Sequence, residues 1–71
     1  MQNLLTEDVL LNRKLLNTFM EVNSSVEVLD VEPETDPSVP SENGRYLKVM
    51  TKDHGWLHVY FRKDNGKLEW Y

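Results

Sequence analysis

The last third of the chain constrains the fold most, because it contains two turn signals between runs of β-forming residues. The dipeptide Asn65-Gly66 best tolerates positive φ at both central positions of a type I′ turn, so a two-residue loop is predicted there. This loop pairs Phe61 with Trp70 on one face of a hairpin. It also places Arg62 opposite Glu69 on the other face. A three-residue loop would instead oppose Phe61 to Glu69, which is poorer cross-strand chemistry.

The preceding turn, Asp53-His54-Gly55, is predicted as a three-residue loop with Gly55 in the left-handed region. This loop pairs Val49 with Val59, whereas a two-residue loop would scatter the aliphatic residues over both faces. The two hairpins then share an apolar inner face made of Leu47, Val49, Leu57, Val59, Phe61, Leu68 and Trp70. The outer face carries Tyr46, Lys48, Met50, Lys52, Trp56, His58, Tyr60, Arg62, Glu69 and Tyr71.

Residues 7–22 are predicted to form an amphipathic helix. Thr6 is a good N-cap, and Glu7 and Asp8 place negative charge in the first turn, where the helix dipole favours it. The apolar stripe expected to cover the inner face is Leu11, Leu15, Phe19 and Val22. Three further apolar residues flank this stripe: Val9, Leu16 and Met20. Two interpretations of the flank stay open, cover by loops or the first strand and a helix-mediated dimer contact.

The middle of the chain is predicted to be a strand over residues 25–32 followed by a loop over residues 33–44. The apolar alternation of the strand breaks, which favours a bulge between Val28 and Asp30. Three prolines interrupt regular structure in the loop. With strands also expected at about 45–52, 56–63 and 67–71, the fold class is α+β, a helix packed on a three- to four-stranded antiparallel meander.

Length and composition place the protein among small single domains. Its 71 residues include no cysteine, so disulfides and thiolate metal sites are excluded. The amino terminus lacks the basic region of a signal peptide, and no apolar run approaches the roughly 20 residues that span a bilayer. A cytoplasmic protein without membrane contact is therefore expected.

Charge is distributed unevenly along the chain. Residues 21–44 contain seven acids and no base, whereas residues 45–71 contain six bases and three acids. The candidate binding residues of this acidic stretch are Glu27, Asp30, Glu32, Glu34, Asp36 and Glu42. Four of them, from Asp30 to Asp36, fall at every second position and project to one side of an extended chain at roughly 6.6 Å intervals. Such a row could imitate a phosphate backbone.

The outer face is the second candidate binding surface, with Tyr46, Lys48, Met50, Lys52, Trp56, His58, Tyr60, Arg62 and Tyr71 as its candidate residues. Aromatic rings among cations suit stacked bases of single-stranded nucleic acid. The same residue types also stabilise a solvent-facing sheet or form the centre of a protein interface. The net charge of −4 disfavours nucleic acid, because it repels phosphate.

Signals for catalysis or cofactor binding are weak. The two histidines, His54 and His58, lack a convincing third metal ligand, and each glycine falls in a turn and not in a phosphate-binding loop. No cofactor is expected. The sequence therefore predicts a non-enzymatic module, an inhibitor or regulator, that binds a protein of unknown identity through the outer face, the acidic stretch or both. Self-association as a homodimer is the further alternative.

Overall fold

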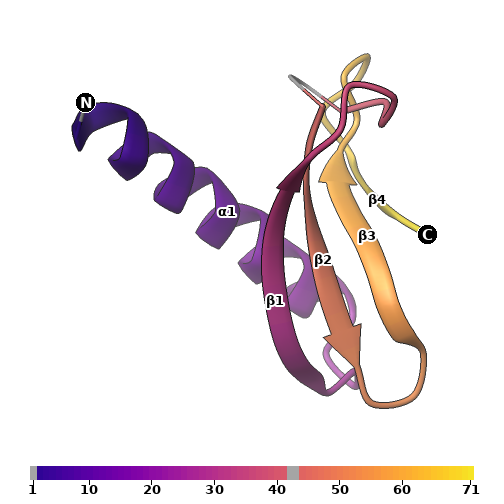
Figure 1. Ribbon diagram of the computed structural model, residues 1–71. Coiled ribbons are helices and arrows are strands. Elements are labelled where there is room, and N and C mark those ends of the chain that lie inside the picture. The colour runs from indigo at the N-terminus through magenta and orange to yellow at the C-terminus, as the bar shows by residue number, and fades with distance from the viewer. Residues whose placement is uncertain (1, 42–43) are drawn as a thin grey trace.

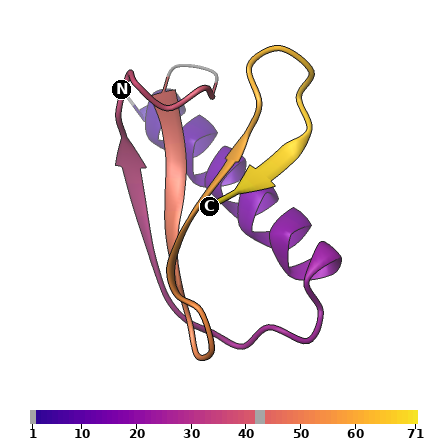
Figure 2. The same cartoon turned by 90° about the vertical axis from the view of Figure 1, so that its right-hand side faces the viewer.

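The computed structural model describes the backbone of residues 2–41 and 44–71, and the side chains of residues 10–41 and 44–71. Within these residues, α1 (Gln2–Val22) precedes four strands: β1 (Val28–Thr35), β2 (Arg45–Thr51), β3 (Gly55–Phe61) and β4 (Leu68–Trp70). The strands form an antiparallel sheet in the order β1-β2-β3-β4, and α1 crosses one of its faces (Figures 1 and 2). The predicted α+β architecture is confirmed.

The helix α1 begins earlier than predicted. It starts at Gln2 and not at Glu7, so Thr6 lies inside the helix and does not cap it. No glycine or proline precedes Thr6 to stop the helix from extending toward the amino terminus. The side chains of Thr6 and Val9 lie outside the described residues. The carboxyl end agrees with the prediction, because α1 ends at Val22 and both the backbone N–H and the side-chain amide of Asn23 donate to the carbonyl of Phe19.

The core lies between the second half of α1 and the inner face of the sheet. It contains Leu15, Phe19, Leu47, Val49 and Val59. Seven partly buried residues pack around it: Leu16, Val26, Val28, Val31, Leu57, Phe61 and Leu68. The ring of Phe19 meets Trp70 edge-on, with centroids 5.6 Å apart. The predicted inner face is therefore confirmed.

The predicted helical stripe is only partly correct. Leu15 and Phe19 are buried, but Leu11 and Val22 are exposed. For Leu11 the reason is geometric, since it lies in the first half of α1, which projects beyond the sheet (Figure 1). Val22 is instead the last residue of the helix. Of the flanking residues, Leu16 packs against the core, whereas Met20 remains exposed.

Strand β1 contains the predicted bulge, but it begins at Val28 and not at residue 25, and it ends later than predicted. The register with β2 shifts between Val28 and Asp30, as the broken alternation indicates. The strand then continues through Pro33 to Thr35, which corrects the assignment of residues 33–35 to the loop. A proline is tolerated here because β1 is an edge strand and one of its sides needs no N–H donors.

The β2–β3 hairpin has a different register from the predicted one. Val49 pairs with Leu57 and not with Val59, and Thr51 pairs with Gly55. Gly55 does adopt positive φ, at 68°. The Thr51 hydroxyl accepts a hydrogen bond from His54 N–H and donates one to the Gly55 carbonyl, each 3.0 Å long. These bonds close the turn one residue earlier than expected.

The β3–β4 hairpin is shifted in the same way. Phe61 pairs with Leu68, and Trp70 pairs with Val59. Because Gly66 N–H donates to the Arg62 carbonyl at 2.8 Å, the loop spans residues 63–66 and exceeds the predicted Asn65-Gly66. Both shifts are even numbers of residues, so each side chain stays on its predicted face.

Candidate protein interface on the outer face

The register of β1 joins the two candidate surfaces into one. Asp30 lies opposite Met50, Glu32 opposite Lys48 and Glu34 opposite Tyr46. These three acids, the acidic row, therefore share the face of the sheet that carries the predicted outer-face residues. An acidic edge strand and an aromatic sheet face thus form one continuous surface.

Three predicted acids lie outside the acidic row. Asp36 follows β1, and its carboxylate accepts hydrogen bonds from the backbone and side chain of Ser38, which lower the pKa of Asp36. Glu27 precedes β1 and is exposed. Glu42 lies outside the described residues. The prediction of four evenly projecting acids thus holds for Asp30, Glu32 and Glu34 and ends where the chain turns at Asp36.

Contrary to the expectation from the sequence, the outer face is not accessible to a partner over its whole extent, because Tyr46 and Tyr60 are buried. Both are buried, at 8% and 5% exposed, in a second apolar cluster with Val39. Val39 belongs to the loop after β1, which folds back over the sheet. The loop is held by bonds from Asp36 N–H to the Gly44 carbonyl and from Lys63 N–H to the Pro40 carbonyl. Tyr46 and Tyr60 therefore support the face from within.

A stack of rings continues from this cluster toward the carboxyl end. The centroid of the His58 ring lies 5.2 Å from that of Tyr46 and 4.7 Å from that of Tyr71. The rings of His58 and Tyr71 are nearly parallel. Tyr71 also meets Tyr60 edge-on at 6.1 Å. Backbone bonds in both directions between His58 and Tyr71 keep the terminal residue beside β3. Tyr71 is 61% exposed and so presents an ordered aromatic ring to solvent.

Two cations of the outer face, Lys48 and Arg62, already have partners within the fold. The ammonium of Lys48 lies 3.8 Å from Glu32 and 5.0 Å from the Trp56 ring centroid. Arg62 contacts Asp64 through two nitrogens, at 2.8 and 2.9 Å, and Glu69 at 3.2 Å. These contacts raise the pKa of Arg62 and lower that of Asp64. The predicted direct pairing of Arg62 with Glu69 is wrong, because Glu69 lies opposite Tyr60, but the two side chains still form an ion pair across the strands.

The accessible part of the face is therefore smaller than predicted. Trp56 and Tyr71 are exposed, Met50 and His58 are half-buried, and Lys52 lies in the exposed turn after β2. Trp56 lies directly opposite Met50 in the hairpin. The acidic row borders this aromatic and thioether surface along its β1 side.

Ionisation of the buried phenols of Tyr46 and Tyr60 is expected to destabilise the fold at alkaline pH. Burial raises the pKa of Tyr60 above its usual 10.0, and the bond to Glu69 and the charge of that carboxylate raise it further. Burial likewise raises the pKa of Tyr46. Because these folded-state values exceed the unfolded ones, the stability contributed by the phenols is fully present below about pH 10 and is lost as pH rises through the raised values.

We therefore expect the urea concentration at the midpoint of unfolding to decrease as pH rises beyond about 10. This decrease should be less steep in the Tyr60→Phe variant than in the wild type. Urea unfolding followed by circular dichroism at a series of pH values measures the midpoint for both proteins. Phenolate absorbance measures the ionisation of the tyrosines. An identical alkaline loss in Tyr60→Phe would contradict this coupling.

Other kinds of site find little support in the described residues. Among residues 10–41 and 44–71, no three side chains of metal-ligating type lie close enough to hold an ion. In the part of the chain with described backbone, no helix is both long and apolar enough to cross a membrane. No family model, curated protein or solved structure is significantly similar to this chain.

Two residues on the helix side of the sheet, Asn12 and Arg45, were not predicted as site residues. Asn12 and Arg45 face a hollow there together with Pro33, Glu34 and Thr35. A signal was present, because Asn12 interrupts the leucines of α1 at helical spacing from Leu15 and so places an amide on an otherwise apolar face.

Proposed function

We propose that this protein is a small, non-enzymatic binding module whose outer face engages a basic surface of a partner protein. The observation that supports this most is the β1–β2 register, which places the acidic row beside Met50 and Trp56. Tryptophan and methionine are enriched at the centres of protein interfaces, and a row of carboxylates attracts basic partners and speeds their association. A regulatory or inhibitory role in the cytoplasm belongs to the same proposal.

A charge-reversed pair of acids tests the proposal. We expect Asp30→Lys with Glu34→Lys to weaken binding at least tenfold, because both carboxylates point toward the partner. The matched control is Glu21→Lys with Glu27→Lys, which changes net charge equally at exposed acids outside the acidic row. Affinity capture from the host cell with the wild-type chain identifies the partner, and calorimetry with the purified pair measures affinity. Equal affinities for the two variants would contradict the proposal.

The same register favours a more specific version, in which the acidic row imitates a phosphate backbone and blocks a nucleic-acid-binding protein. The three carboxylates project from one side of an extended strand at roughly 6.6 Å intervals. In that case, an oligonucleotide should displace the module from its partner. If the partner binds the oligonucleotide and the module at the same time, the phosphate-mimic version is wrong, whereas the general proposal of a protein interface still holds.

Two alternatives have less support. Binding of single-stranded nucleic acid needs free cations and exposed rings, but Lys48 and Arg62 are in ion pairs and Tyr46 and Tyr60 are buried. Self-association through the outer face would bring two acidic rows together. A sedimentation mass near twice 8.4 kDa, lost in the Trp56→Ala variant, would nevertheless assign this face to a homodimer.

A further inference from the structure

Two hollows adjoin at Arg45, on the helix side of the sheet and away from the outer face. The larger has a volume of about 220 Å³ and is lined by Asn12, Pro33, Glu34, Thr35 and Arg45. The smaller has a volume of about 40 Å³ and is lined by Leu11, Leu15, Ser41, Arg45 and Phe61. The larger hollow is thus lined about equally by polar and apolar atoms, the smaller is mainly apolar, and Arg45 lines both.

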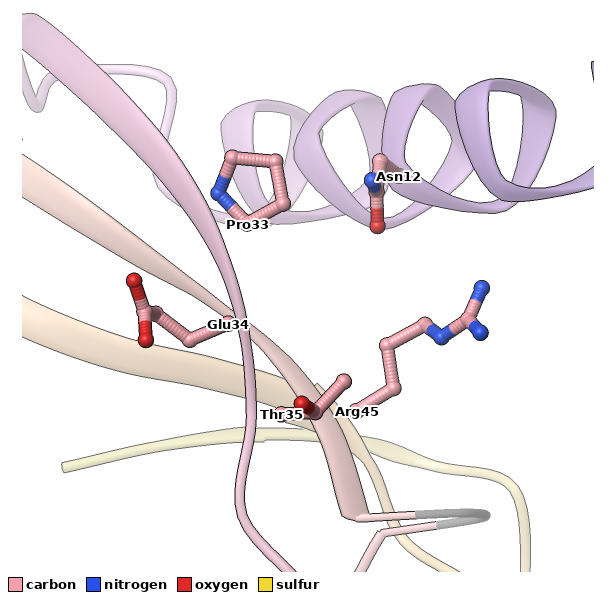
Figure 3. Close-up of a pocket in the computed structure, with 5 residues that line it drawn as sticks. All are labelled: Asn12, Pro33, Glu34, Thr35 and Arg45. Atoms are coloured by element: carbon pink, nitrogen blue, oxygen red, sulfur yellow. The ribbon is translucent and has the colours of Figure 1, made fainter. Parts of the chain in front are cut away.

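The polar groups converge from two elements. Asn12 extends from α1 toward the sheet, and the side chain of Arg45 rises from the start of β2 toward the helix (Figure 3). The carboxylate of Glu34 points away from both side chains (Figure 3). The larger hollow therefore presents an amide and a cation to the same space, with the carboxylate of Glu34 turned out of it.

Two buried polar atoms beside these hollows have no hydrogen-bond partner among the described residues. They are Oδ1 of Asn12 and Oγ of Ser41, and Ser41 as a whole is 4% exposed. Buried polar atoms are nearly always hydrogen-bonded, so each exception needs an explanation. One such atom in each of two adjoining hollows indicates that the hollows accept a polar ligand.

The lining restricts the chemistry of that ligand. A guanidinium favours a carboxylate, and its five N–H donors allow it to contact a ligand together with a protein partner. Asn12 Oδ1 requires a donor, and the Ser41 hydroxyl can donate to a second carboxylate oxygen. Leu11, Leu15 and Phe61 accept a short hydrocarbon group. The volumes fall below the roughly 300–1,000 Å³ of drug-sized sites, so the ligand is small.

We propose that these hollows bind an apolar α-amino carboxylate, with the carboxylate on Arg45 and Ser41 and the α-nitrogen donating to Asn12 Oδ1. The side chain of the ligand then occupies the smaller hollow. Free valine and a polypeptide ending in valine both present this chemistry. Glu34 belongs to both regions, but its carboxylate points out of the hollow (Figure 3), so ligand binding here can be tested separately from the proposed protein interface.

The test is a titration of the isotope-labelled chain followed by NMR amide shifts. The probes are L-valine, N-acetyl-L-valine as the analogue of a chain end, and L-valinamide, which lacks the carboxylate. We expect saturable shifts at Asn12, Ser41 and Arg45 with at least one carboxylate probe and none with valinamide. Binding of L-valine alone assigns a free amino acid, and binding of N-acetyl-L-valine alone assigns a chain end. Binding of both shows that the carboxylate and one N–H suffice.

Variants connect the shifts to the proposed contacts. Arg45→Gln should weaken binding at least tenfold, whereas Arg13→Gln, at an exposed position of α1, should leave it within twofold. Asn12→Leu is nearly isosteric and removes the acceptor for the α-nitrogen, so it should also weaken binding at least tenfold. If Arg45→Gln fails to fold, the affinity of Asn12→Leu decides. Absence of saturable shifts with both carboxylates, or equal binding by Asn12→Leu, would overturn the proposal.

Discussion

Replacing Phe19 with alanine is expected to lower the free energy of unfolding by about 3–5 kcal/mol. The side chain is 1% exposed and packs on the inner face of the sheet, where its ring meets that of Trp70 edge-on. A domain of 71 residues has a total stability of only roughly 4–11 kcal/mol. The variant should therefore lose a large part of the stability of the domain.

Urea unfolding followed by circular dichroism measures this loss. The matched control is Met20→Ala at the adjacent position of α1, where the side chain is 45% exposed. That variant should lose less than about 1 kcal/mol, because the methionine contributes little to the core. Equal stabilities of the two variants would show that the second half of α1 does not pack on the inner face as described.

Replacing Gly44 with alanine is expected to lower the free energy of unfolding by about 2–4 kcal/mol. Gly44 has φ of 63°, and a Cβ there would overlap the backbone of Asp36 and Pro37. To avoid this overlap, the backbone at residue 44 would have to move away from Asp36. This movement would separate the two ends of the loop that covers the outer face. Val39 should then leave the cluster with Tyr46 and Tyr60, and hydrogen exchange at these tyrosines should accelerate.

The Gly66→Ala variant separates the cost of positive φ from the cost of the steric overlap. Gly66 has a similar φ of 68°, but the space around its Cβ position is open. This variant should lose only about 1 kcal/mol from backbone strain. The difference between the two variants in urea unfolding then measures the overlap with Asp36. If both lose the same amount, the close approach of Gly44 to Asp36 is not a determinant of the loop.

The faces of the sheet were predictable although the registers were not. Val49 and Trp70 each have a different partner from the predicted one, but both still lie on the inner face. Side-chain direction in a strand alternates with period two, so a two-residue shift preserves it. The bulge at Val28 and Asp30 was predictable for the same reason, since the break in alternation is visible in the residues themselves.

The position of the β2–β3 turn and the length of the β3–β4 turn depended on weaker contacts that residue types do not specify. The loop of the β3–β4 hairpin spans residues 63–66, and in it Asn65 Oδ1 accepts from Lys67 N–H. In the β2–β3 hairpin the Thr51 hydroxyl closes the turn. Each such bond contributes only about 1 kcal/mol, comparable to the difference between competing turns. Residue preference alone therefore selected the wrong loop in both hairpins.

The two candidate sites differ in how far residues alone revealed them. The acids and aromatic residues of the outer face were identified, but the burial of Tyr46 and Tyr60 was not. Val39 is a single apolar residue among prolines and has no periodicity that would connect it to the sheet. The hollow at Arg45 was missed because Asn12 and Arg45 are 33 positions apart in the chain.

Local patterns were enough to establish a helix, a two-faced antiparallel meander and the bulge in its edge strand, because periodicity and turn residues act within a few positions. Accessibility was decided by the tertiary structure. Val39 covers Tyr60 from 21 positions away, and hollows remain between the middle of α1 and the start of β2. Burial is a property of segments distant in the chain that meet in space, and the contacts that create it have no local signature.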